Sequence, residues 1–441
     1  MLTALALDIP PDPVGIARRL ADAGRSRIAL LHAADPTGDF GRFSYVAADP
    51  DRASEAIDPL VDDPDFQGAT GALASVPRWI GVLPYEHFRD LERPAWSSPE
   101  TRAAPLVERP IWHRYPAVVA IDHREGRVLV AGTDRGAIQA LAELARRPPP
   151  ARSEPLSLHV HDAEPTLVHA ARISAARELI FAGDLYQVNL ARRLAVELRG
   201  GDALGLYAAL GRRAPTPFGA YLELDTDRRV LSTSPELLLA ASVSASNSSR
   251  GAFDRLVTAP IKGTRPRGRD AGEDHARVLD LDRDPKEIAE LSMIVDVVRN
   301  DLGKVAQTGS VRLARPPHVV THRTIHHRLA LLVARAKPEL ARVDILRSLV
   351  PSGSVTGAPK VRAMEVIASL EGHRRGLYTG GIGFVAQDGS MLLSMAIRTV
   401  VLRGREGEYL TGGGIVADSD PGREVEETRW KALQLEAAAR G

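Results

Sequence analysis

Apolar residues recur along the first part of the chain with the spacing of short strands. Apolar, partly β-branched runs bounded by turn residues predict strands at 27–32, 118–122 and 127–131. Helical spacing then predicts a helix at 135–146. The first part of the chain therefore reads as strands joined by loops and closed by a helix.

The second part of the chain mixes helical and extended patterns. Residues 169–182 have helical spacing, and Gly183 is suited to end that helix. Residues 185–194 alternate between apolar and polar, which predicts a strand with Gln187 on its polar face. Residues 384–402 predict a hairpin. The mixture favours an α+β or mixed-sheet architecture.

A proline-rich segment marks the clearest break in composition. Three consecutive prolines, 148–150, and Pro155 favour an extended linker. We therefore expect an N-terminal subdomain at 1–150 and a larger domain at 160–441. Residues 242–253 are rich in serine and predict a surface loop.

Composition excludes several classes of function. The 441 residues carry a net charge of +1, and this balance argues against a nucleic-acid partner. The chain has no cysteine, which excludes disulfides, zinc–thiolate sites and a cysteine nucleophile. The start has no basic segment before its short apolar stretch, and no apolar run approaches the ~20 residues of a membrane span. We expect a cytoplasmic protein with no membrane partner.

Two predicted helices begin with the same arrangement of residues. Asp-Pro opens each one, and each carries two glutamates three residues apart, Glu287 with Glu290 and Glu424 with Glu427. Brought face to face, the two pairs would form an oxygen-only cluster suited to Mg²⁺. The alternative is that these glutamates only interact with the helix dipole, and Asp284 with Glu287 also fits a capping box.

Several segments, taken together and in order, resemble one enzyme family. They are Asp184–Leu190, Ser234–Leu237, Pro260–Thr264, Met293–Asp296, Arg299–Gly303, Gly353–Lys360, Ala396–Thr399 and Gly412–Pro421. This set resembles the chorismate-utilising enzymes, which include the anthranilate, aminodeoxychorismate, isochorismate and salicylate synthases. The match extends from about residue 165 to the C-terminus and is weaker before residue 150.

The resemblance implies a fold and a metal site. The fold would be α+β and anthranilate-synthase-like, with two large sheets packed face to face, helices outside, and both halves of the chain contributing. Glu290 and Glu427 would hold Mg²⁺, supported by Glu287 and Glu424. The ion would neutralise the ring carboxylate of chorismate, because a dianionic substrate needs charge compensation in a dry pocket.

The resemblance also assigns substrate contacts. Arg398, which we place on an alternating strand, and Tyr378 would hold the enolpyruvyl carboxylate; the alternative for Arg398 is an internal ion pair. The backbone of Gly412, Gly413 and Gly414 would bind an anion, the alternative being a plain turn at a strand end. The substrate-binding set implied by the resemblance also includes Gln187, Gly263 and Thr264.

Two further residues match catalytic positions of the family. Glu236 would be the general acid that protonates the departing C4 hydroxyl, so we expect burial to raise its pKa. His327 matches the active-site histidine, with His326 as the alternative because the surrounding residues depart from the common family pattern.

Two positions discriminate between reactions within the family. Gln187 stands where the water-adding enzymes have a lysine base, and a glutamine cannot activate water. Lys262 stands where anthranilate synthases have an alanine, and this resembles the aminodeoxychorismate branch. A lysine in a partly desolvated site beside cations can be a nucleophile. The alternative is a Lys262 that only forms a salt bridge with the substrate.

The predicted reaction is therefore the conversion of chorismate and ammonia to 4-amino-4-deoxychorismate. Ammonia would come from a separate glutamine amidotransferase subunit, since this chain lacks the cysteine that such an enzyme needs. One alternative is anthranilate synthase component I, although a regulatory tryptophan site near 30–34 is doubtful without its serine. The other is a chorismate-binding protein without activity.

Overall fold

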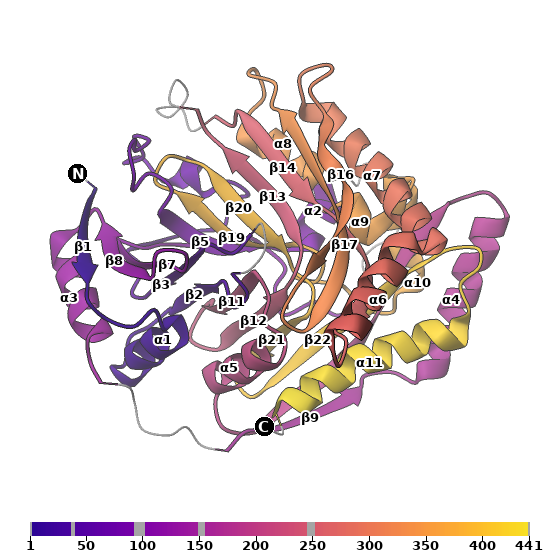
Figure 1. Cartoon of the computed structure of the whole chain (residues 1–441), viewed down its shortest axis with the longest axis horizontal. Helices are drawn as coiled ribbons and strands as arrows, with labels where there is room; N and C mark the ends of the chain where they lie inside the picture. Colours follow the sequence, from indigo (N-terminus) through magenta and orange to yellow (C-terminus); the bar gives the residue numbers. More distant parts are fainter. Residues whose placement is uncertain (1, 37–39, 92–101, 149–154, 245–251, 440–441) are drawn as a thin grey trace.

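The structure is a computed structural model that describes residues 2–36, 40–91, 102–148, 155–244 and 252–439. Its strands form two antiparallel sheets, one of 12 strands and one of 10, with the helices outside them (Figure 1). The predicted fold class is confirmed. Both sheets take strands from each side of the proline-rich segment. Most of that segment and the centre of the serine-rich loop lie outside the described residues.

The larger sheet brings distant parts of the chain side by side. Its order is β1 (Thr3–Leu7), β8 (Arg127–Gly132), β7 (Ala117–Asp122), β3 (Phe43–Ala47), β2 (Ala29–His32), β11 (Phe218–Glu223), β12 (Arg228–Ser234), β21 (Thr399–Arg403), β22 (Glu406–Ile415), β10 (Gln187–Gly200) and β18 (Gly357–Ala358), and β9 (Ser157–Asp162) also pairs with β10.

The smaller sheet is built in the same way. Its order is β15 (Ile261–Pro266), β17 (Ile325–Arg335), β14 (Arg255–Ala259), β13 (Leu237–Ser242), β20 (Met391–Met395), β19 (Gly381–Ala386), β5 (Pro77–Leu83), β6 (Ile111–Arg114) and β4 (Arg52–Ser54), and β16 (Arg312–Thr321) also pairs with β17.

The helices cover the outer faces of the sheets (Figure 1). They are α1 (Pro13–Asp22), α2 (Tyr85–Leu91), α3 (Arg135–Ala145), α4 (Thr166–Phe181), α5 (Ala203–Arg213), α6 (Ala271–Arg283), α7 (Pro285–Val305), α8 (Arg342–Leu349), α9 (Gly353–Thr356), α10 (Lys360–Leu370) and α11 (Pro421–Ala439), with a 3₁₀ turn at Pro59–Asp62. None of the helices in the described ranges is both long and apolar enough to cross a membrane.

Strand β7 shows how the layers are held together. Val118 and Ala120 pack in a core that also contains Ile382 of the other sheet. Val119 and Ile121 point the opposite way, into a core shared with α1 and α3. Successive side chains of a strand face opposite sides of the sheet, so an apolar run can serve two cores. This explains why β7 reads as a continuous apolar run.

The two predicted Asp-Pro helix starts are confirmed. The Asp284 side chain accepts from the backbone N–H groups of Lys286 and Glu287 and caps α7. Asp420 accepts from the N–H of Arg423 at 2.9 Å at the start of α11. Helix α4 begins at Thr166, three residues before its predicted start, and ends before Gly183, which has a φ of +86°. Strands β2, β7, β8 and helix α3 lie where they were predicted.

The prediction of one hairpin over 384–402 is wrong in its second half. β19 and β20 form a hairpin in the smaller sheet, but β21 belongs to the larger sheet. Arg398 is therefore not on an alternating strand; it lies in the link between the sheets, with a φ of 50°. Alternation describes a local extended backbone, so it cannot report that the chain changes sheets.

Candidate active site

One cavity, of about 480 Å³, gathers nearly all of the residues to which the sequence assigned chemistry. It is lined by residues of both sheets and of helices α7 and α11. Among the predicted site residues, all except Gln187 line it. They are Glu236, Lys262, Gly263, Thr264, Glu287, Glu290, His327, Tyr378, Arg398, Gly412, Gly413, Gly414, Glu424 and Glu427.

Two links between the sheets bring Glu236 and Arg398 to this cavity. The chain passes from the larger to the smaller sheet between β12 and β13, at Glu236, and returns between β20 and β21, at Arg398. The links are joined by hydrogen bonds from Met395 N–H to the Glu236 carbonyl (3.0 Å) and from Thr233 N–H to the Arg398 carbonyl (3.1 Å). The left-handed φ of Arg398 is a strained conformation for a non-glycine residue, held by these surroundings.

Glu236 is in the environment that its predicted role requires. Its residue is 5% exposed, and the Ser354 hydroxyl donates to Oε1 at 3.1 Å. Burial raises the pKa of Glu236 from 4.5 to about 7, against the smaller opposing effects of the Ser354 hydrogen bond and the Lys262 charge. The predicted rise in pKa is confirmed. A large fraction of Glu236 therefore carries a proton at neutral pH.

The Arg398 guanidinium is available to an incoming anion. Within the described ranges no Asp or Glu forms an ion pair with it, although it lines a cavity with five glutamates. Burial lowers the pKa of Arg398. Tyr378 lines the same cavity, and its ring lies 5.6 Å from the guanidinium carbon of Arg375. The alternative predicted for Arg398 was an internal ion pair, and the described residues do not form one.

Lys262 enters the cavity from strand β15. The pairing of β15 with β17 shifts between Lys262 and Thr264, and Gly263 between them has a φ of +80°. This bulge helps to place four consecutive residues, 261–264, on the cavity wall. The Lys262 Nζ lies 4.0 Å from Oε2 of Glu290. Its ion-pair neighbour is thus a carboxylate, while three cationic side chains, Lys286, Arg398 and Lys431, line the same cavity.

His327 is held in one orientation and one protonation state. Its Nδ1 lies 3.0 Å from the Thr264 hydroxyl and 3.4 Å from the Gly263 carbonyl. A carbonyl only accepts, so Nδ1 carries the proton. Burial, followed by the charge of Arg398, lowers the pKa of His327 well below 6.5. The neutral ring therefore presents an unprotonated Nε2, which has no partner among the described residues.

His326, the alternative to His327, is engaged elsewhere. It is fully buried, with Nδ1 2.9 Å from the Thr321 hydroxyl and Nε2 3.0 Å from Oδ1 of Asp274. It does not line the cavity. Neighbouring residues of a strand face opposite ways, so only one of the two histidines can face the site.

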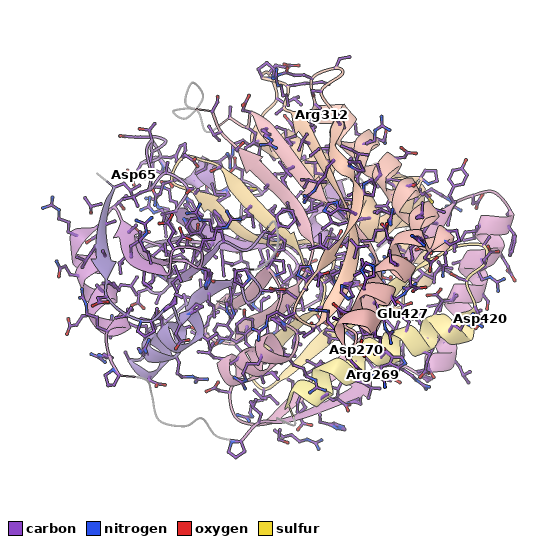
Figure 2. All side chains as sticks on the ribbon, viewed as in Figure 1. Asp65, Arg269, Asp270, Arg312, Asp420 and Glu427 are labelled. Atoms are coloured by element: carbon purple, nitrogen blue, oxygen red, sulfur yellow. The ribbon has the colours of Figure 1, made fainter. Side chains whose placement is uncertain are left out.

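The two pairs of glutamates converge from α7 and α11, and Glu427 can be located in Figure 2. Burial, with added repulsion from Glu290, raises the pKa of Glu287. Burial raises the pKa of Glu424 in the same way, with repulsion from Glu427. Such raised pKa values mean that the carboxylates lack sufficient positive charge around them, which a bound cation would supply.

Lysines are the present counter-charges of these carboxylates. Lys431 Nζ lies 2.8 Å from Oε1 of Glu427, and Lys286 Nζ lies 3.7 Å from Oε1 of Glu290. Burial would raise the pKa of Glu427, but the net shift is downward because of Lys431 and two other lysines. In the part of the chain that the structure covers, no three acidic or histidine side chains are already grouped at metal-binding spacing. The donor set suits Mg²⁺, but its arrangement here does not include a formed metal site.

Gly412–Gly414 lie inside strand β22, not in a turn. They pair with β10 on one side, while β21 pairs with β22 only at Val400–Arg403. The backbone is thus open on the cavity side, where Lys431 donates to the Gly412 carbonyl at 2.8 Å. A Cβ on Gly414 would lie 2.6 Å from Nε2 of Gln187 and 3.2 Å from Nζ of Lys262. A larger residue here would require the end of the Gln187 side chain to move.

Gln187 and Asn189 add unsatisfied polar atoms to the site. Gln187 is 1% exposed, and neither its Oε1 nor its Nε2 has a partner among the described residues. Asn189, two residues further along the same face of β10, lines the cavity with an unpartnered Oδ1. No role was predicted for Asn189, although its position two residues after Gln187 on an alternating strand placed both side chains on the same face.

Two other cavity residues were also missed. Ser354, which bonds Glu236, lies in the Gly353–Lys360 segment, but nothing local gives its direction. Lys431 lies four residues after Glu427 on α11, a spacing at which helix side chains meet. The second of these was readable from the sequence.

A second cavity, of about 270 Å³, lies at the segment where a tryptophan site was considered doubtful. Leu31, His32 and Ala33 line it together with Tyr45 and Phe384. Burial lowers the pKa of His32 to about 4, so the side chain is neutral. These features do not test tryptophan binding, so the expected lack of a regulatory tryptophan site here stays a prediction.

Comparison with known proteins places this geometry in a family. A relative from Streptomyces coelicolor named anthranilate synthase component 1 is 33% identical over 452 residues, covering 93% of this chain and 83% of the relative. A relative of the same name from Thermus thermophilus is 41% identical over 263 residues, which are 60% of this chain and 54% of the relative. The chain thus matches about half the length of the second relative.

Solved structures agree on the fold. Anthranilate synthase component I from Streptococcus pneumoniae superposes with a TM-score of 0.72 and 26% identity, covering 99% of this chain and 92% of that one. MenF, the menaquinone-specific isochorismate synthase of Escherichia coli, gives a TM-score of 0.76 at 18% identity, covering 100% and 95%. The family model for chorismate binding enzymes matches residues 38–436. The chain belongs to the family of chorismate-binding enzymes.

Proposed function

We propose that the chain is the chorismate-binding component of an ammonia-using synthase and that its product is 4-amino-4-deoxychorismate. The observation that carries the choice of product is Lys262, whose side chain enters the cavity near Glu236, the buried carboxyl group. The side chain of Gln187 lies next to Gly414. A glutamine cannot act as the base that would activate water. Addition of ammonia needs no such base, because ammonia is already nucleophilic.

The proposed reaction has two stages. Nζ of Lys262 forms a bond to C2 of chorismate, the ring double bond shifts, and the C4–O bond breaks as Glu236 donates its proton, releasing water. Ammonia then forms a bond to C4 and gives up a proton to the Glu236 carboxylate, the double bond shifts back, and the C2–N bond breaks to release Lys262 as a neutral amine. The enolpyruvyl group stays on the ring throughout.

Substrate binding in this proposal depends on charge. Arg398 takes the enolpyruvyl carboxylate in bidentate fashion, and Tyr378 donates to it. The open backbone edge at Gly412–Gly414 provides N–H groups for an anion. The unpaired guanidinium of Arg398 supports this role.

The cofactor in this proposal is Mg²⁺. Glu290 and Glu427 would hold it, with Glu287 and Glu424 close by. It would supply positive charge to the ring carboxylate of chorismate. The raised pKa values of Glu287 and Glu424 support a cation at this place.

The nitrogen source in this proposal is a separate glutamine amidotransferase subunit. This chain has no cysteine for that chemistry. Supply from a partner predicts that free ammonium can replace the subunit in vitro.

Anthranilate synthase component I is the second candidate, and the relatives favour it. The two relatives and the Streptococcus structure described above all carry that name. In that reaction the aminated ring loses pyruvate and becomes aromatic. Lys262, in place of the alanine of that branch, is the residue that argues for the other product.

One incubation tests both candidates. The pure chain is mixed with chorismate, MgCl₂ and ammonium chloride at mildly alkaline pH, and products are resolved by chromatography and mass. Accumulation of 4-amino-4-deoxychorismate, converted to 4-aminobenzoate by an added lyase, supports the proposal. Release of anthranilate with pyruvate supports the second candidate.

The variant Lys262→Ala then tests the lysine. Loss of 4-amino-4-deoxychorismate formation in a variant that still binds chorismate supports Nζ as nucleophile. Unchanged turnover would show that Lys262 only pairs with the substrate or with Glu290. Exposed Lys304→Ala, on α7 but outside the cavity, is the control.

A further inference from the structure

A buried Asp–His hydrogen bond lies next to His327. His322 is 7% exposed and Asp35 is fully buried. Nδ1 of His322 donates to Oδ2 of Asp35 at 2.9 Å, and the backbone N–H of Arg323 donates to the same oxygen at 3.2 Å. A buried carboxylate that receives two hydrogen bonds fixes the groups that donate to it.

The pair joins two parts of the chain. Asp35 follows β2 of the larger sheet, and its N–H donates to the Thr216 carbonyl at 3.1 Å. His322 lies in the turn between β16 and β17 of the smaller sheet, where its N–H donates to the Ile325 carbonyl at 2.8 Å. Both partners are thus anchored by backbone hydrogen bonds before they meet.

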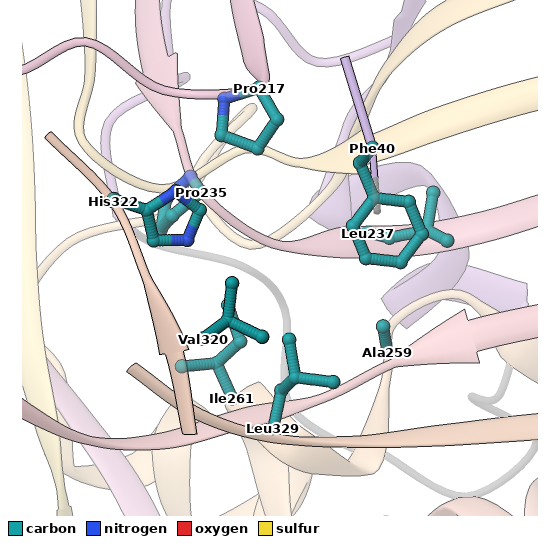
Figure 3. Close-up of a pocket in the computed structure, with 9 residues that line it drawn as sticks. All are labelled: Phe40, Pro217, Pro235, Leu237, Ala259, Ile261, Val320, His322 and Leu329. Carbon is teal, nitrogen blue, oxygen red and sulfur yellow. The ribbon is translucent and has the colours of Figure 1, made fainter. Parts of the chain in front are cut away.

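The ring of His322 contacts His327. The ring centroids are 5.6 Å apart and the planes make an angle of 69°, an edge-to-face contact. Figure 3 shows His322 on the wall of a small cavity of about 10 Å³, whose other walls include Phe40, Pro217 and Pro235. These walls are apolar, and the space is at the lower limit for one water molecule. None of the described residues that line this cavity competes with Asp35 for Nδ1 of His322.

We propose that Asp35 and His322 are a positioning pair for His327. Thr264 and Gly263 hold Nδ1 of His327, and the His322 ring packs against the His327 ring, so that Nε2 keeps one direction. Neither Asp35 nor His322 lines the active-site cavity, and both therefore act through His327. The proposal rests on the proposed function, in which His327 is the predicted active-site histidine.

The experiment compares three variants of the full chain. His322→Ala removes the ring, and we expect kcat to fall about tenfold with KM for chorismate changed less than twofold, since small misplacements of catalytic groups reduce rates strongly. His322→Phe restores a ring against His327, and we expect most of that loss to be recovered. Asp35→Asn keeps the shape but not the charge, and we expect an intermediate loss. Asp274→Asn is the matched control, because it alters an Asp–His pair at the same turn that does not reach the cavity.

A readout besides activity separates positioning from general stability. ¹⁵N spectra of histidine-labelled protein report which nitrogen of His327 carries the proton. We expect the Nδ1–H form in the wild type and in Asp274→Asn, and a mixture of the two forms in His322→Ala and Asp35→Asn. Unchanged His327 signals in a folded His322→Ala or Asp35→Asn chain, or unchanged kcat, would overturn the inference. A wild type that does not aminate chorismate counts against the proposed function, and the spectra still test the pair.

Discussion

Replacing Glu236 by glutamine should stabilise the protein above neutral pH while it strongly reduces kcat. An acid whose folded-state pKa is above its unfolded value binds more protons in the folded state at intermediate pH. The unfolding free energy of the wild type therefore falls as pH rises from 4.5 to about 7, and it stays lower above that pH. Glutamine does not titrate, and its Oε1 can still accept from Ser354, so the variant lacks this loss.

The size of the effect follows from the pKa. The pKa of Glu236 rises from 4.5 to about 7 on folding. At about 1.4 kcal/mol for each pKa unit, the wild type loses about 3 kcal/mol of unfolding free energy as the pH rises through this interval. An unfolding entropy of about 2 cal/mol/K per residue over 441 residues gives about 0.9 kcal/mol/K. The melting temperature of Glu236→Gln, relative to the wild type, should therefore rise by about 3 °C between pH 5 and pH 8.

The assay is a set of thermal unfolding scans of both proteins at pH 5, 6, 7 and 8, without substrate or Mg²⁺. Glu426→Gln is the control, since its side chain is 59% exposed and forms a surface ion pair with Arg429. The unfolding free energy of Glu426→Gln should stay within about 0.5 kcal/mol of the wild-type value at every pH. If the Glu236→Gln difference does not grow between pH 5 and pH 8, the argument that burial keeps this carboxyl protonated is wrong.

Activity should follow the same titration. A general acid must be protonated, so kcat/KM of the wild type should fall tenfold for each pH unit above about 7. Glu236→Gln should lose about 100-fold or more of kcat. A flat pH profile between pH 6 and 9 would contradict the role of Glu236 as the acid.

Three further predictions concern binding. Arg398→Lys loses the bidentate geometry and should raise KM for chorismate about tenfold in steady-state assays; an unchanged KM would place the carboxylate elsewhere. Gly414→Ala puts a methyl group 2.6 Å from Nε2 of Gln187 and 3.2 Å from Nζ of Lys262 and should weaken chorismate binding measured by calorimetry. Gly303→Ala, on α7 with nothing within 4 Å of the added carbon, should leave binding unchanged. Chelation of divalent ions should stop turnover, and MgCl₂ should restore it; turnover that persists in EDTA would rule out the metal role.

The ends of helices and the elements of local pattern were readable from the sequence. Asp284 followed by Pro285 specified the start of α7, because capping and proline at the first position act within one turn. The same arrangement at Asp420 specified α11 and so fixed the spacing of Glu424 and Glu427 on its face. The start of α4, three residues earlier than predicted, shows the usual limit of such patterns at helix ends.

The positions of Glu236 and Arg398 depended on the tertiary structure. Both lie where the chain changes sheets, and their neighbours in the two links bond to one another across more than 150 residues of sequence. The alternating pattern continued through Arg398, so it predicted an ordinary strand. Such a link forms when two sheets twist and pack against each other, which no local pattern records.

The sequence by itself determined which residue types were present for the chemistry and which helices carried the paired glutamates. It also determined the family, through ordered segments from about residue 165 onward. Only the tertiary structure decided which of His326 and His327 faces the cavity, that burial raises the pKa of Glu236, and that Arg398 has no acidic partner within the described ranges. Side-chain direction and local dielectric depend on which distant segments pack together, and that information is not contained in any single window of the chain.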